Sequence, residues 1–198
     1  MAARADKIDT RRRLLEAGIR LFLENGYHGT GLKAVLDDVG IPKGSFYNYF
    51  DSKDAFGVAT ISFYADGMGA KLADALAAAA DPVAGLRAFF EGEMAQFERS
   101  GFVGGCLVAN LGGELEASPR LREALAEAFG RYLGGICEAV AAAQRQGLIR
   151  GDVAAVELAR VLVDAWEGAV IRMKIERSLE PLAACLRHVL GGYLAAGA

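Results

Sequence analysis

Residues 30–53 constrain the fold of this chain more than any other segment. They read T-G-L-K-A-V-L-D-D-V-G-I-P-K-G-S-F-Y-N-Y-F-D-S-K, two short stretches with helical apolar spacing on either side of Gly40. Glycine ends a helix because it adopts the left-handed conformation without strain, and Pro42 suits the entry of the next helix. The segment therefore predicts two short helices joined by a tight turn, the plan of a helix-turn-helix.

Helical spacing of apolar residues continues along the chain, and no segment alternates with the period of a strand. We expect a first helix that is capped by Thr10 and ends at Asn25-Gly26. Six later helices are expected over residues 52–79, 81–99, 104–116, 119–146, 152–178 and 180–195, with a proline near the start of three of them. The prediction is an all-α chain with a boundary between residues 1–52 and 53–198.

The second helix of the predicted pair begins with small and cationic residues, as a helix that approaches DNA requires. Basic residues exceed acidic ones by nine to seven in residues 1–53, whereas residues 54–198 hold thirteen and eighteen. Side chains of these types contact phosphates, sugars and base edges. The candidate DNA-binding residues are Thr30, Lys33, Lys43, Gly44, Ser45, Tyr47, Asn48, Tyr49 and Lys53. The alternative is an ordinary helical hairpin with a solvated polar face.

The run I-P-K-G-S-F-Y-N-Y-F-D-S-K-D-A-F, residues 41–56, resembles the N-terminal domain of TetR-family repressors. The resemblance implies an all-α fold with an N-terminal three-helix helix-turn-helix domain and a C-terminal helical ligand-binding and dimerisation domain. It also implies a homodimer that binds a palindromic double-stranded DNA operator and releases it when a small-molecule inducer binds. No cofactor is implied. Gly31 departs from the hydroxyl residue common in the family, so a side-chain contact with phosphate is lost there.

Two further segments, G-G-C-L-V-A-N-L-G-G-E-L (104–115) and I-E-R-S-L-E-P-L (175–182), resemble a subgroup of that family. The subgroup contains the electrophile-sensing repressor of N-ethylmaleimide reductase and acrylate-responsive repressors. Cys106 follows two glycines at a predicted helix start, where the helix dipole stabilises a thiolate that electrophiles or oxidants would modify. Lys174 would stabilise this thiolate if the fold brings them together. The alternative is a cysteine that only packs, as we expect for Cys137 and Cys185.

Apolar side chains in the C-terminal part are candidates for an inducer pocket or, alternatively, for the ordinary core. The candidates are Phe63, Phe89, Phe97 and Trp166, with Asn110 as a polar anchor. The last two predicted helices carry apolar residues that, by the resemblance, form a dimer interface. The sequence alone also allows them to form a bundle within one chain.

Several other classes of protein receive little support. No apolar run is long enough to span a bilayer, and the basic N-terminus lacks the apolar segment of a signal peptide, so we expect a cytoplasmic protein. Three cysteines and two histidines are too widely spaced to predict a disulfide framework or a metal site. No catalytic motif is present, so an enzyme is not expected. A small helical enzyme, a protein-binding adaptor and a repressor with a non-covalent inducer remain as alternatives.

Overall fold

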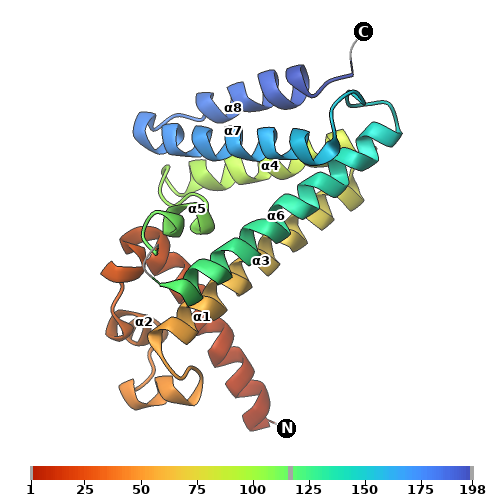
Figure 1. The fold of residues 1–198 in the computed structure, drawn as a ribbon. Coiled ribbons are helices and arrows are strands. Elements are labelled where there is room, and N and C mark those ends of the chain that lie inside the picture. The colour runs from red at the N-terminus through yellow and green to blue at the C-terminus, as the bar shows by residue number, and fades with distance from the viewer. Residues whose placement is uncertain (1, 116–117, 197–198) are drawn as a thin grey trace. The chain divides into compact units, whose positions relative to one another are not determined.

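The computed structural model describes residues 2–115 and 118–196, apart from the side chains of residues 2–6 and Lys43, and most of these residues are helical (Figure 1). The helices are α1 (Ala2–Gly29), α2 (Leu32–Val39), the 3-10 helix η1 (Lys43–Asn48), α3 (Lys53–Ala78), α4 (Pro82–Arg99), α5 (Leu107–Gly112), α6 (Pro119–Arg145), α7 (Ala155–Glu176), α8 (Glu180–Cys185) and its π-helical continuation η2 (Leu186–Tyr193). The only pairing of extended chain in these ranges is an isolated bridge between Ile149 and Ala195. The all-α prediction is confirmed. No helix of the described part is long and apolar enough to cross a membrane.

The chain divides into two compact units that do not follow the order of the sequence. The helix-turn-helix unit contains residues 1–66 and 107–128, and the C-terminal unit contains residues 67–106 and 129–198. Helices α3 and α6 each contribute to both units. The boundary expected from the sequence, at residues 52–53, divides a DNA-binding part from a ligand-binding part. This division by function is different from a division into compact units, and it stays a prediction.

A cluster of phenylalanine rings forms the core of the helix-turn-helix unit. The ring centroid of Phe56 lies 5.7 Å from that of Phe22, 5.7 Å from that of Phe46 and 5.0 Å from that of Phe50. All four side chains are buried. Gly18 is required beside this cluster, because a Cβ atom there would lie 2.5 Å from the Phe56 ring. The cluster anchors η1 between α1 and α3.

The predicted turn between the two short helices is confirmed. Gly40 has a φ of 73°, and its amide donates to the carbonyls of Leu36 and Asp37, which closes the C-terminus of α2. The segment after Pro42 is a single 3-10 helix rather than an α-helix. The inward-facing Phe46 lies within this element and Phe50 follows two residues after its end, so the packing of their side chains fixes this short element.

Two predicted helix boundaries were wrong. Helix α1 begins at Ala2, upstream of Thr10, so Thr10 lies inside the helix rather than at its cap. The expected end at Asn25-Gly26 corresponds to a break, because Gly26 has a φ of 71°, although helical residues resume to Gly29. The helix expected over 104–116 is shorter, since Gly104 and Gly105 have φ values of 100° and 102° that no helix accommodates. Its last expected residue, 116, lies outside the described residues.

The core of the C-terminal unit lies mainly between α4, α6, α7 and the α8–η2 segment. Trp166 of α7 is buried, and its ring lies 4.5 Å from that of Phe90 on α4. Many of the apolar residues expected to pair in a dimer interface pack inside this core instead: Leu158, Leu162, Val163, Val170, Leu182, Leu186 and Leu190. The last two helices therefore form an intramolecular bundle, and only their outer surface remains for a second chain.

Candidate functional site

The second helix of the helix-turn-helix presents polar and aromatic side chains to solvent. Tyr47 is 64% exposed, Asn48 is exposed, and a Cβ atom added at Gly44 would meet nothing within 4 Å. Ser45 and Tyr49 are half-buried at the edges of this surface. Because Phe46 and Phe50 take the inward positions, the residues between them are held outward. This surface is sterically open to a DNA groove.

The cations predicted to contact phosphate are in different states. Lys33 on α2 is exposed and pairs with Asp37 at 2.5 Å, a contact that phosphate can replace. The ammonium of Lys53 is less available, because it donates to the carbonyl of Tyr27 at 2.7 Å and lies 4.4 Å from the ring centroid of the same residue. Burial lowers the pKa of Lys53, and the negative charges of Glu114 and Asp54 offset part of this by raising it. The side chain of Lys43 lies outside the described residues.

The hydroxyl group of Thr30 is not placed for the contact with DNA that was expected of it. The residue is 2% exposed, and its Oγ1 donates to the carbonyls of Gly26 and Leu21 at 2.7 and 3.0 Å. The hydroxyl therefore stabilises the break at the end of α1. At this position only the backbone amides of the first turn of α2 remain for phosphate.

Sequence reasoning missed two cations of α1 that lie beside the recognition segment. The ammonium of Lys7 is 5.9 Å from the ring centroid of Tyr49, and the guanidinium of Arg11 is 5.3 Å from that of Phe50. Both residues are exposed. The signal was their spacing of four, which places them on one side of a helix within the basic N-terminal run.

Cys106 lies immediately before α5, where Gly104 and Gly105 allow the chain to turn into the helix. Its half-buried thiol donates a hydrogen bond to the carboxyl group of Glu167 on α7. The pKa of Glu167 is raised to about 7, chiefly by burial. The hydrogen bond from the Cys106 thiol and the positive charge of Lys174 oppose this rise, and the negative charge of Asp164 adds to it. Both predicted sensor residues, Cys106 and Lys174, therefore act on the same carboxyl group. Glu167 could not be identified from the sequence, since a glutamate on a helix usually faces solvent.

The other two cysteines belong to the core of the C-terminal unit. Cys185 is buried, and this burial raises the pKa of its thiol to about 11, which disfavours the reactive thiolate. Cys137 is partly buried and packs against the same core. All three cysteines are thiols rather than disulfides.

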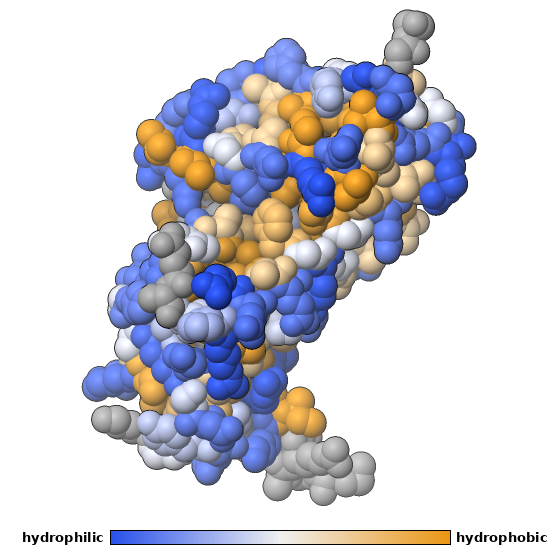
Figure 2. Space-filling model, viewed as in Figure 1, coloured by the Kyte–Doolittle hydropathy of each residue, from blue (hydrophilic) through white to orange (hydrophobic). Residues whose placement is uncertain are grey.

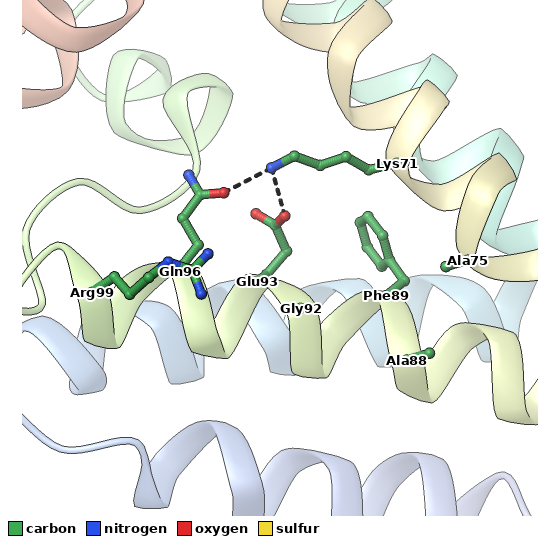
Figure 3. A pocket seen from close by; sticks show the side chains of 8 residues that line it. All are labelled: Lys71, Ala75, Ala88, Phe89, Gly92, Glu93, Gln96 and Arg99. Atoms are coloured by element: carbon green, nitrogen blue, oxygen red, sulfur yellow. Dashed lines mark hydrogen bonds and ion pairs between the residues drawn. The ribbon is translucent and has the colours of Figure 1, made fainter.

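A pocket of about 230 Å³ opens between α3 and α4 in the C-terminal unit. Figure 3 shows Lys71 reaching from α3 to the side chains of α4, where its ammonium donates to Glu93 at 2.8 Å and Gln96 at 2.9 Å. Glu93 is buried whereas the side chain of Lys71 is 47% exposed, so this ion pair is only partly shielded from solvent. The apolar side of the pocket is formed by Phe89, Ala75, Ala88 and Gly92, and Arg99 completes the polar side.

The remaining candidates for an inducer pocket do not form one site. Phe89, Phe97 and Trp166 are buried in the core of the C-terminal unit, and of these only Phe89 lines the pocket beside α3. Phe63 and Asn110 are half-buried residues of the helix-turn-helix unit. Most of the aromatic candidates thus serve the core.

Known protein families match both the N-terminal and the C-terminal part of this chain. The family described as bacterial regulatory proteins, tetR family, matches residues 14–60, and the tetracyclin repressor-like C-terminal domain matches residues 82–189. The chain is 34% identical to the HTH-type transcriptional repressor DhaR of Mycobacterium sp. (strain GP1), over 87% of this chain and 86% of that protein. It is 32% identical to the HTH-type transcriptional repressor NemR of Escherichia coli (strain K12), over 91% and 92% of the two chains.

The fold agrees with these sequence matches. The crystal structure of the reduced form of E. coli NemR superposes with a TM-score of 0.87 at 32% identity, covering 96% of this chain and 99% of that one. The helix-turn-helix, its outward polar surface and the helical C-terminal unit are all accounted for by one family. The chain belongs to the TetR family and is a DNA-binding transcriptional repressor.

Proposed function

We propose that this repressor releases its operator when an electrophile or oxidant modifies Cys106. The observation that carries the proposal is the cluster at Glu167, where a half-buried thiol and the charge of Lys174 act on one carboxyl group. A carboxylate beside a thiol can take its proton, and a nearby ammonium favours the thiolate that results. The similar NemR protein has been crystallised in a form described as reduced, which fits a thiol-based sensor.

The chemistry with a Michael acceptor needs no other reactant. The Cys106 proton passes to the Glu167 carboxylate, and the sulfur forms a bond to the β-carbon of an α,β-unsaturated carbonyl compound. The C=C electrons shift to give an enolate, which then takes a proton, so the product is a neutral thioether. The added group must fit beside Glu167 on α7. We infer that modification of Cys106 displaces α5, which follows it directly in the chain, and so favours the conformation that does not bind DNA.

Substitution of the cysteines tests this proposal. N-ethylmaleimide should release operator DNA from the wild-type protein and from Cys137→Ser, as measured by fluorescence anisotropy, but not from Cys106→Ser. Mass spectrometry of the same samples reports which cysteine carries the adduct. Release of DNA from Cys106→Ser at the wild-type dose would refute the assignment of the sensor.

A second candidate is the same repressor with a non-covalent inducer, favoured by the pocket between α3 and α4. Lys71, Arg99 and Glu93 give its lining a net charge of +1, opposite an apolar wall. The guanidinium of Arg99 makes no hydrogen bond or ion pair with another described residue. These features suit a small organic acid with a short apolar chain. DNA release by such acids that is lost in Arg99→Ala and kept in Cys106→Ser would favour this candidate.

We also propose that the repressor acts in the cytoplasm as a homodimer on a palindromic operator. The outer face of α7 supports a dimer, since Val161, Ile171 and Ile175 are 41%, 56% and 75% exposed. They lie opposite the buried side of the helix, with Gly168 between them, where a second helix can approach closely. Figure 2 shows hydrophobic surface over the face that α7 and α8 form. Two paired recognition segments would then read two half-sites of the operator.

A further inference from the structure

A single carboxylate from the segment after α5 holds the backbone at the entry of the helix-turn-helix. Glu114 Oε2 accepts a hydrogen bond from the amide of Tyr27 at 2.9 Å, and Oε1 accepts one from the amide of His28 at 2.5 Å. These amides lie at the break in α1, a few residues before α2 begins. A carboxylate that accepts two backbone N–H bonds makes a strong, charge-assisted contact.

The residue before those amides is adapted to the contact. Gly26 has a φ of 71°, and a Cβ atom there would lie 2.5 Å from Glu114 Oε2 and 3.0 Å from Cδ. Any other residue would be strained and would also displace the carboxylate. Gly26 therefore allows both the break in α1 and the approach of Glu114.

The same carboxylate acts on the other end of the helix-turn-helix. The charge of Glu114 raises the pKa of Lys53, the first residue of α3, against the larger effect of burial. Lys53 in turn donates to the carbonyl of Tyr27. Residues that precede α2 and a residue that follows η1 are thus tied together, and we call Glu114, Tyr27, His28 and Lys53 the entry clasp.

The clasp is connected to the proposed sensor by a short stretch of chain. The boundary between the two compact units falls between Cys106 and Leu107, so α5 belongs to the unit that contains the helix-turn-helix. Leu107 and Leu111 of α5 are fully buried, and the amide of Glu114 donates to the carbonyl of Leu111 at 3.0 Å. A displacement of α5 at Cys106 therefore moves the backbone that carries Glu114.

We propose that Glu114 is a positioning residue for operator binding, and that loss of the entry clasp transmits a change at α5 to the helix-turn-helix. Glu114 touches no DNA in this account. It acts by fixing where α2 starts, and hence how the recognition segment is presented. The second half of the proposal rests on the sensor role of Cys106, whereas the first half does not.

Glu114→Gln tests the positioning role, with Glu123→Gln as its matched control. Glu123 is exposed on α6 in the same unit, and both variants remove one negative charge. Charge alone would tighten DNA binding in both. We expect Glu114→Gln to weaken operator binding on the order of tenfold, as expected when a charge-assisted contact is lost. Glu123→Gln should bind at least as tightly as the wild type.

Further readouts separate positioning from a general loss of folding. Thermal unfolding by circular dichroism must show the variant folded at the assay temperature. If Glu114→Gln is not, Glu114→Asp, which keeps the charge but is one methylene shorter, should show the same weakening. Hydrogen exchange at the amides of Tyr27 and His28 should speed up in the variant. Wild-type affinity in a folded variant with unprotected amides would overturn the proposal.

The electrophile response distinguishes this proposal from the one on which it partly rests. If Glu114 transmits the signal, N-ethylmaleimide should release less DNA from Glu114→Gln, in fold-change, than from the wild type. An equal fold-change in both proteins would overturn transmission through the clasp. If the wild-type protein ignores the electrophile while Glu114→Gln still binds DNA weakly, the sensor role of Cys106 fails and the positioning role of Glu114 stands.

Discussion

Two adjacent residues of the recognition segment should respond to alanine substitution in opposite ways. Phe46 is 1% exposed, and its ring lies 5.5 and 5.7 Å from the rings of Phe50 and Phe56. Tyr47 is 64% exposed and loses only an edge contact with Phe46 at 5.5 Å. Phe46→Ala should therefore lower the free energy of unfolding by about 3–5 kcal/mol, and Tyr47→Ala by less than about 1 kcal/mol.

The effect on DNA binding follows from the exposed area of Tyr47. A tyrosine side chain presents about 200 Å², of which 64% remains exposed in this structure. If DNA covers half of that remainder, the contact contributes about 1.5 kcal/mol per half-site at about 25 cal/mol per Å². Tyr47→Ala should then weaken binding about tenfold for each half-site.

Urea denaturation and fluorescence anisotropy on operator DNA check the two halves of this prediction. Tyr47→Ala should unfold at a urea midpoint close to that of the wild type, far above that of Phe46→Ala, and should lose affinity for DNA. Unchanged affinity in a folded Tyr47→Ala would refute the claim that η1 presents this side chain to DNA. A wild-type urea midpoint for Phe46→Ala would refute the assignment of the aromatic core.

Three further predictions concern the core, the sensor and the dimer. Gly18→Ala places a Cβ atom 2.5 Å from the Phe56 ring and should destabilise the protein by about 1–3 kcal/mol in urea titrations, whereas Gly130→Ala on α6 should not. The raised pKa of Glu167, about 7 against 4.5, means that the folded state holds an extra proton between these values. Stability should then fall as pH rises from 5 to 8, by at most about 3 kcal/mol, and Glu167→Gln should flatten this dependence; an equally steep curve in the variant would contradict it. If the proposed dimer forms through α7, Ile175→Asp should give a monomer in light scattering where the wild type gives a dimer, and a dimeric variant would place the interface elsewhere.

The local part of this structure could be predicted from the sequence. The turn at Gly40, the helix starts at Pro82 and Pro119 and the glycines before Cys106 depend on backbone preferences that act within a few residues. The start of α1 could not, because Thr10 resembles a cap while the residues before it are also good helix formers. Cap signals alone do not decide between two acceptable starts.

The contacts that build the candidate sites span long distances in the sequence. Glu114 reaches amides 86 and 87 residues away, and Cys106 meets a carboxyl group on α7. A glutamate in a loop or on a helix shows no sign in the sequence of the amide or thiol that it will face. Similarly, the sequence placed aromatic residues in a pocket, but burial assigned most of them to the core.

Titration of the operator-bound wild-type protein with N-ethylmaleimide, followed by anisotropy and by mass spectrometry in parallel, tests the central claim most directly. The account predicts that DNA is released in proportion to the fraction of Cys106 that carries the adduct, and that release is complete when every protomer is modified. Full modification of Cys106 with the operator still bound at the original affinity would contradict it.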